Sequence, residues 1–189
     1  DGFHIDVMDN HFVPNIMFGA DFVNAVARKA VKQLWIHLMI ENPVEFIHQC
    51  SIPAGSIISF HLETKESIEK IIKRIKEINC LPSITVNPNS DVEQIFPYLH
   101  EINQALIMSV EPGHSGQRFL ESVVSKVDPL VGYRTSKKLS FRIGMDGGIN
   151  TENIGMLAQK GVDDFAIGST IFKAADPGIA LEQLKKRTE

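Results

Sequence analysis

The chain of 189 residues is 43% hydrophobic and 22% charged, with a formal net charge of −4 at pH 7. This composition is typical of a globular domain with a buried core and excludes an extensively disordered chain. No apolar run reaches the roughly 18 residues of a membrane-spanning helix and no leader opens the sequence, so neither membrane insertion nor export is expected. Acidic residues outnumber basic ones, 23 to 19, without a long basic block, so we expect no nucleic-acid partner.

The two cysteines, Cys50 and Cys80, stand apart without a CxxC motif. A disulfide framework or a cysteine-ligated zinc site would need spacings that this sequence lacks. We therefore expect reduced thiols in a cytoplasmic protein.

Short apolar runs alternate with helical patterns along the chain. The runs are nearly continuous, which is typical of strands covered on both faces, and they span residues 3–8, 34–39, 57–61, 83–86, 105–110, 141–145 and 164–167. Helices are predicted over residues 22–32, 67–78, 92–99, 120–133, 151–160 and 177–186. This order predicts an α/β fold with a parallel sheet, either doubly wound or a (β/α) barrel.

The organisation predicts one domain over residues 1–189, because no Gly/Ser linker or change of composition divides the chain. Seven strand–helix units are one fewer than a closed eight-unit barrel contains. The chain also starts almost directly on a strand. We expect that either the first βα unit is missing from this sequence or the fold is not a closed barrel.

The densest chemical signal is the segment FHIDVMDNHFVPN, which begins at Phe3. Residues two apart share one face of a strand, so His4, Asp6 and Met8 point the same way. A histidine and a carboxylate on one buried face require a metal, mutual pairing or hydrogen bonds. A metal site and a hydrogen-bonded His–Asp pair in the core are the two interpretations of this segment.

Two further segments extend this pattern. His37 and Met39 share one face of the next strand, and Asp146 ends a later strand just before two glycines. Two histidines and two aspartates form a ligand set that suits Zn, Fe, Co or Mn better than Ca or Mg. For Asp146 alone, a helix N-cap or an Asx turn near Asn150 is the alternative.

Glycine-containing turns follow three of the late strands, at residues 111–119, 146–148 and 168–172. Glycines let backbone N–H groups approach an anion closely, and phosphate sites of (β/α) barrels commonly use the loops after the last two strands. A short helix beginning near Ser169 would add its dipole. Ordinary turn glycines are the alternative for each loop taken singly.

Several motifs together carry a resemblance to a known family. They are HxDVMDxHFVPN, HLM followed by NP, FHLE at residues 60–63, MSVEPGHSGQRF at 108–119, MDGG at 145–148 and GST at 168–170. In order and spacing, essentially the whole chain resembles ribulose-phosphate 3-epimerase. The resemblance implies a (β/α)₈ TIM barrel that interconverts D-ribulose 5-phosphate and D-xylulose 5-phosphate with one divalent metal ion, Zn or Fe first and Mn or Co next.

The resemblance also implies roles for individual residues. The implied metal ligands are His4, Asp6, His37 and Asp146. Asp6 and Asp146 are the implied acid/base pair, which would invert C3 through an enediolate by serving its two faces. The implied substrate contacts are Met8, Met39, Met108, Gly116, Gly147, Gly148, Gly168 and Ser169. The implied partners are a small ketose phosphate and further copies of the chain.

Three positions depart from the family pattern: Asn10 replaces a glycine, Met145 a valine, and His114–Ser115 stand where the family has Phe–Gly. Asparagine tolerates a left-handed turn, so we expect Asn10 to preserve the local fold. The altered 114–115 loop keeps open a 3-epimerase of a six-carbon ketose phosphate such as D-allulose 6-phosphate. Two further alternatives are a non-catalytic sugar-phosphate-binding barrel and another phosphate-binding barrel enzyme, such as a decarboxylase or a synthase.

Overall fold

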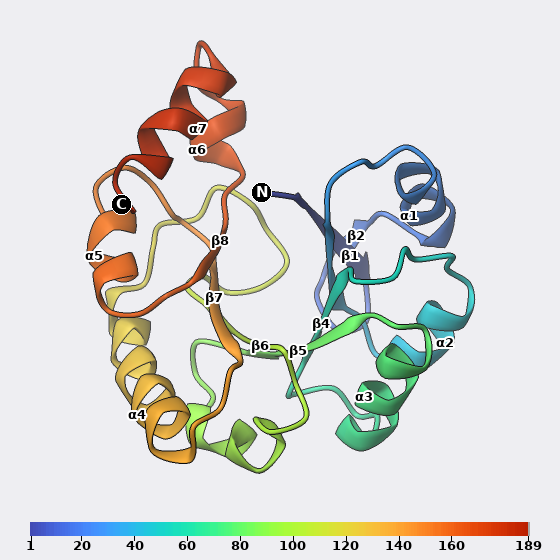
Figure 1. Cartoon of the computed structure of the whole chain (residues 1–189). Helices are drawn as coiled ribbons and strands as arrows, with labels where there is room; N and C mark the ends of the chain where they lie inside the picture. Colours follow the sequence, from blue (N-terminus) through green and yellow to red (C-terminus); the bar gives the residue numbers. More distant parts are fainter. Residues whose placement is uncertain (189) are drawn as a thin grey trace.

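The computed structural model describes residues 1–188 (Figure 1). Its strands are β1 (Phe3–Asp9), β2 (Ile16–Met17), β3 (Leu34–Met39), β4 (Ile57–His61), β5 (Leu81–Val86), β6 (Gln104–Met108), β7 (Arg142–Asp146) and β8 (Asp164–Ala166). Its α-helices are α1 (Ala20–Ala27), α2 (Pro43–His48), α3 (Ile68–Glu77), α4 (Val127–Lys137), α5 (Ile154–Gln159), α6 (Ser169–Phe172) and α7 (Pro177–Lys185). Two 3₁₀ helices, η1 (Val92–Tyr98) and η2 (Glu121–Lys126), complete the list.

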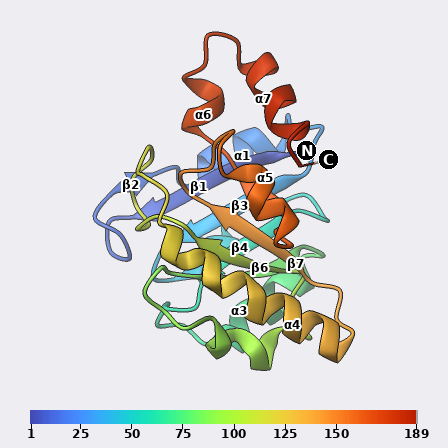
Figure 2. The same cartoon turned by 90° about the vertical axis from the view of Figure 1, so that its left-hand side faces the viewer.

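All strands form one sheet in the order β2-β1-β3-β4-β5-β6-β7-β8. Every pairing is parallel except that of β2, which folds back antiparallel on β1. The sheet curls into a barrel-like shape with the helices outside it, as Figures 1 and 2 show. Within residues 1–188, no pairing joins β1 to β8. The predicted α/β fold of the TIM-barrel type is confirmed.

The strand register places polar side chains on the inner face of the curled sheet. Asp6 pairs with His37 between β1 and β3, and Met108 pairs with Asp146 between β6 and β7. The alternate residues of each strand point outward and pack against the helices, where they form the main hydrophobic core. A small inner cluster of Trp35, Ile57, Leu106 and Ala166 fills the opposite end of the sheet's interior. The functional end of the interior is therefore left to polar residues and methionines.

The helix predicted over residues 67–78 is observed as α3, which begins after Ser67. The Ser67 hydroxyl accepts a hydrogen bond from the Lys70 N–H, and Ile71 and Ile75 are fully buried. This is the expected combination of an N-cap and an apolar face.

Other helical predictions are correct in place but not in type or length. The segment predicted over 92–99 is the 3₁₀ helix η1, which contains Pro97, and proline removes a backbone donor that an α-helix would use. The segment predicted over 120–133 divides into η2 and α4. Helix α2 has only six residues, too few for the periodic pattern by which helices are found in sequences.

None of the helices in residues 1–188 combines the length and the apolar character that crossing a bilayer requires.

Candidate metal centre and active site

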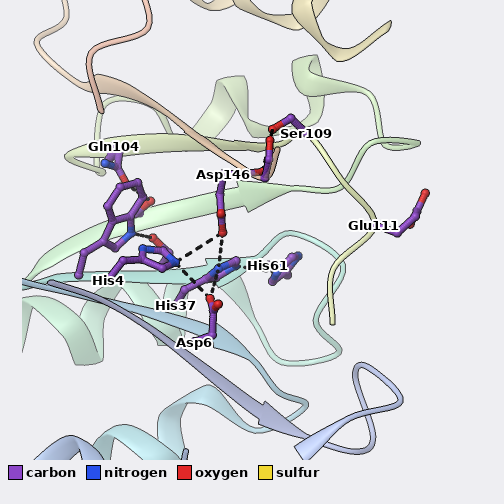
Figure 3. A network of polar contacts seen from close by, with 12 residues as sticks. His4, Asp6, His37, His61, Gln104, Ser109, Glu111 and Asp146 are labelled. Atoms are coloured by element: carbon purple, nitrogen blue, oxygen red, sulfur yellow. Dashed lines mark hydrogen bonds and ion pairs between the residues drawn. The ribbon is translucent and has the colours of Figure 1, made fainter. Parts of the chain in front are cut away.

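Four side chains from three strands meet at one place inside the curled sheet. His4 and Asp6 come from β1, His37 from β3 and Asp146 from the end of β7. Each offers one ligand atom, and these four atoms lie within 4.8 Å of one another. Figure 3 shows the two aspartates reaching the histidine pair from opposite sides. The predicted four-residue cluster is thus assembled in the fold.

The distances inside the cluster are short and involve one nitrogen of each imidazole. His4 Nε2 lies 3.1 Å from Asp6 Oδ1 and 3.5 Å from Asp146 Oδ2. His37 Nδ1 lies 3.3 Å from each of the same two oxygens. Two nitrogens and two oxygens therefore converge on a common point.

The charges of the cluster shift the pKa of every member. Burial alone would lower the pKa of His4, but Asp146 and Asp6 outweigh it and raise that pKa to about 10. Burial likewise opposes, without preventing, a raised pKa at His37. Burial would raise the pKa of both aspartates, yet His37 and His4 hold these values well below the usual range. Without a metal, the cluster is two imidazolium–carboxylate pairs.

The residues fit a divalent metal ion. His37 Nδ1 is buried and has no hydrogen bond within residues 1–188, although it faces two carboxylate oxygens. Such an unpartnered buried atom is costly unless it binds something. Two imidazole nitrogens and two carboxylates suit Zn or Fe. A hydrogen-bonded His4–Asp6 pair is present as well, but it leaves His37 unexplained.

The alternative role considered for Asp146, a cap or Asx turn, belongs to other residues. Asn150 Oδ1 accepts a hydrogen bond from the Glu152 N–H at 2.8 Å, and α5 begins only after Asn153. The backbone of Asp146 is instead held by Ser109, whose N–H and hydroxyl both donate to the Asp146 carbonyl, at 2.8 and 2.9 Å. The Asp146 side chain is free to face the cluster.

Three methionines surround the cluster, as the strand pattern predicts. Met8, Met39 and Met108 are buried and end β1, β3 and β6 close to the ligand atoms. Met8 and Met39 pair across β1 and β3 and form an apolar group with Val13. All three line the cavity that contains Asp6 and Asp146.

This cavity has a volume of about 1330 Å³ and lies along the gap between β1 and β8. The three glycine-containing loops line it, and Gly116, Gly147, Gly148, Gly168 and Ser169 all contribute. The Thr170 hydroxyl donates to the Ile149 carbonyl at 2.6 Å, which ties the loop after β8 to the loop after β7. Lys173 Nζ lies beside Gly116, at 3.6 Å from the position of a Cβ on that residue. The loops thus share one end of the sheet, as expected.

The loops before and after the cluster have the conformations that their sequences predict. Asn10 adopts a left-handed φ of 61°, in agreement with the expectation for this departure from the family pattern. The Asp9 carboxylate fixes this turn by accepting hydrogen bonds from the N–H groups of His11, Phe12 and Glu41. His114 and Ser115 lie exposed at the rim of the cavity.

Gly148 is a position where only glycine fits. Its φ is 63°, and a Cβ would lie 2.6 Å from the backbone nitrogen of Phe119. We expect Gly148→Ala to lower the free energy of unfolding by about 1–3 kcal/mol. Gly132→Ala is the control, because nothing lies within 4 Å of a Cβ there and α4 should gain about 0.5–1 kcal/mol. Urea unfolding of both variants checks the opposite signs, and equal midpoints would contradict this reading.

Sequence reasoning did not assign four residues that shape the cluster. Trp35 contacts His4 edge-on, with ring centroids 4.6 Å apart, and its indole N–H donates to Ser59 at 2.6 Å. Ser109 holds the backbone of Asp146, and His61 and Glu63 lie behind His37. His61 and Glu63 belong to the FHLE motif, so the signal was present in the sequence without an indication of its role.

The chain was compared with known proteins. The sequence model of the ribulose-phosphate 3 epimerase family matches residues 1–172. The cytoplasmic isoform of ribulose-phosphate 3-epimerase from rice (Oryza sativa subsp. japonica) is 33% identical, over 100% of this chain and 83% of the relative. Ribulose-phosphate 3-epimerases from Aquifex aeolicus and Helicobacter pylori are each 36% identical, over 96% and 98% of this chain and 82% and 85% of the relative.

Solved structures agree in fold. KGPDC from Streptococcus mutans has a TM-score of 0.70 at 14% identity, and covers 99% of this chain and 96% of its own. A structure of the same protein in complex with a pentose phosphate has a TM-score of 0.67 at 16% identity, with 91% and 80% covered. 3-Hexulose-6-phosphate synthase from Salmonella typhimurium follows at 0.61 and 16%, with 100% and 98% covered. These likenesses concern the fold alone, whereas the sequence matches show that the chain belongs to the ribulose-phosphate 3-epimerase family of enzymes.

Proposed function

We propose that this enzyme interconverts D-ribulose 5-phosphate and D-xylulose 5-phosphate by metal-dependent proton transfer at C3. The observation that carries the proposal is the placement of Asp6 and Asp146 on opposite sides of the two histidines, at the wall of the cavity (Figure 3). The family match and the relatives' names support the pentose phosphate as substrate.

The two carboxylates have the positions that inversion at one carbon requires. A hydrogen next to a ketone is acidic because its removal places charge on oxygen, which produces an enediolate. Asp6 and Asp146 come from strands β1 and β7, so a sugar held between them meets a carboxylate on each face. One carboxylate removes the proton and the other, once protonated, returns one to the opposite face. The roles exchange when the reaction runs backwards.

His4, Asp6, His37 and Asp146 would hold the divalent metal ion. When bound, such an ion supplies Lewis-acid stabilisation of negative charge on oxygen. The low pKa values of both aspartates keep them ionised, ready both to act as ligands and to accept a proton.

The remaining cavity residues orient the sugar and protect the intermediate. Met8, Met39 and Met108 present polarizable side chains without acidic protons, so they can border a planar carbanion without quenching it. Backbone N–H groups near Gly148, Gly168 and Ser169 would bind the phosphate, with Gly116 and Gly147 shaping the same loops and Lys173 adding positive charge nearby. A fixed phosphate supplies remote binding energy that orients the reacting carbon.

The decisive experiment is an assay of both sugars with one preparation of enzyme. We expect turnover of D-ribulose 5-phosphate with a kcat/KM well above that for D-allulose 6-phosphate. The six-carbon sugar is the second candidate because His114 and Ser115 stand exposed at the cavity rim, where a longer chain would extend. A preference for the six-carbon sugar would reassign the substrate, and absence of turnover on both would leave a non-catalytic barrel.

Gly168 separates binding from folding. A Cβ at Gly168 meets nothing within 4 Å and its φ is negative, so Gly168→Ala should leave Tm unchanged. Because the methyl group would occupy the approach to the backbone, we expect KM to rise by about tenfold, or roughly 1.4 kcal/mol. Ser169→Ala should change KM only modestly, because backbone groups do the binding. Steady-state kinetics with Gly132→Ala as control checks this, and an unchanged KM in Gly168→Ala would exclude phosphate binding there.

We also propose that the chain acts in the cytoplasm and associates with copies of itself. The first rests on the rice relative, which is a cytoplasmic isoform, and on cysteines that remain free in the fold. The second rests on the resemblance to the family and is tested by light scattering of the purified protein.

A further inference from the structure

Behind the cluster, His37 leads to a buried histidine and a carboxylate that the proposed reaction does not use. His37 Nε2, on the side away from the aspartates, lies 2.9 Å from Nε2 of His61. His61 Nδ1 in turn faces Glu63 Oε2 at 3.4 Å, and neither of these two atoms has a better hydrogen bond within residues 1–188. Figure 3 shows His61 beyond His37 as seen from the aspartates.

This contact links the tautomers of the two imidazoles. Two nitrogens 2.9 Å apart require one donor and one acceptor. If His37 offers the Nδ1 lone pair to a metal, its proton is on Nε2 and His61 Nε2 must accept it. The His61 proton then lies on Nδ1, which faces the carboxylate. His37 and His61 are 0% and 1% exposed, so water cannot replace either partner.

Glu63 is itself fixed, so the direction of this chain is determined at its far end. Glu63 Oε1 accepts hydrogen bonds from the backbone N–H of Asn87 at 3.0 Å and from the Ser90 hydroxyl at 2.5 Å. Lys126 donates to the carbonyls of Asn87 and Ser90 and so secures the loop that carries both donors. The second carboxylate oxygen, Oε2, is thereby directed at His61.

We propose that Glu63, acting through His61, is a positioning residue that holds His37 in the tautomer whose Nδ1 lone pair points into the four-residue cluster. The inference rests on the metal site of the proposed function. It adds that the affinity of this site depends on two residues that touch neither metal nor substrate. Partners of this kind that orient a ligand typically change metal affinity by about 10- to 100-fold.

The isosteric variant Glu63→Gln tests the proposal. A backbone N–H can only donate, so the oxygen of the introduced amide remains on Asn87 and its NH₂ group faces His61. A donor opposite Nδ1 favours the His61 proton on Nε2, which in turn favours a proton on Nδ1 of His37. We expect the zinc dissociation constant, measured by competition with a chromogenic chelator and without substrate, to rise about 10- to 100-fold.

Glu66→Gln is the matched control. Glu66 is also half-buried, and its carboxylate also accepts a backbone N–H, from Val44 at 3.0 Å. Zinc affinity equal to wild type in Glu66→Gln and lowered in Glu63→Gln supports the proposal. His61→Phe, which removes the acceptor for His37, should weaken zinc binding to a similar extent. Equal zinc affinity in wild type, Glu63→Gln and Glu66→Gln would overturn it.

A second measurement needs no variant and covers the case in which Glu63→Gln fails to fold. Long-range ¹H–¹⁵N NMR of the zinc-loaded wild-type protein should show the His61 proton on Nδ1. A proton on Nε2 would overturn the proposal. A wild-type protein that binds no zinc would instead overturn the proposed metal site and this inference with it, so the two failures are distinguishable.

Discussion

Replacing either Asp6 or Asp146 by asparagine should lower the rate of epimerisation by about 10²- to 10⁴-fold, the usual contribution of a positioned acid or base. Inversion needs both faces of the carbon served, so one remaining carboxylate does not suffice. Asparagine still offers a carbonyl oxygen, so partial metal retention is expected. Metal content must therefore be measured beside activity, by atomic absorption on the same preparation. Asp21→Asn, on the exposed surface of α1, is the control.

Solvent isotope exchange distinguishes catalysis from binding in these variants. In deuterated water the intact enzyme should place deuterium at C3 of the product, because the returning proton comes from a solvent-exchanged acid. A variant that keeps its metal should still exchange the C3 hydrogen of the epimer whose proton faces the surviving aspartate, while forming none of the other epimer. Epimerisation at a near wild-type rate in either variant would overturn the two-base assignment.

The strand pattern was sufficient to predict much of this site. The period of two along β1 and β3 predicts that His4 and Asp6 share a face, and that His37 faces the same way with Met39. Parallel pairing in register then brings Asp6 directly opposite His37. These inferences need only local geometry, which explains why they survive in the folded chain.

The position of Asp146 depends on something that periodicity does not contain. β7 pairs with β6 and β8 and not with β1, yet Asp146 Oδ2 lies 3.5 Å from His4 Nε2. Only the curl of the whole sheet brings these strands together. A flat doubly wound sheet, which the same alternation of elements also allowed, would have kept the two residues apart. The resemblance to the family supplied that choice before the structure did.

The role of His61 could not be predicted for a different reason. Its position two residues before Glu63, at the end of β4, is visible in the sequence, but its link to His37 is a nitrogen–nitrogen contact between neighbouring strands. That contact depends on side-chain rotamers and on ring protonation, about which hydrophobic periodicity carries no information. The acceptor role of Glu63 depends in addition on a loop more than twenty residues further along the chain.

Removing the metal should abolish activity, and the metal should return in competition with protons. A chelator should lower kcat by roughly a thousandfold or more, since Lewis-acid stabilisation amounts to several kcal/mol. In the metal-free protein at pH 7, His4, with a pKa of about 10, is protonated, and the raised pKa of His37 favours its protonated form. Both nitrogens must lose their protons to bind, so zinc uptake at pH 7 should release between one and two protons.

The sign of the pH dependence follows from those shifts. A raised pKa stabilises the proton-bound, metal-free state, so zinc affinity falls as the pH is lowered and rises as the pH approaches the pKa of His4. Each displaced proton changes the affinity tenfold per pH unit, which gives about a 10- to 100-fold gain between pH 6 and pH 7. Calorimetric titration in buffers of different ionisation enthalpy measures both quantities, with zinc, iron(II), manganese and cobalt compared for recovery of activity. Zinc affinity that is constant from pH 6 to pH 8, without proton release, would contradict the assignment of His4 and His37 as ligands.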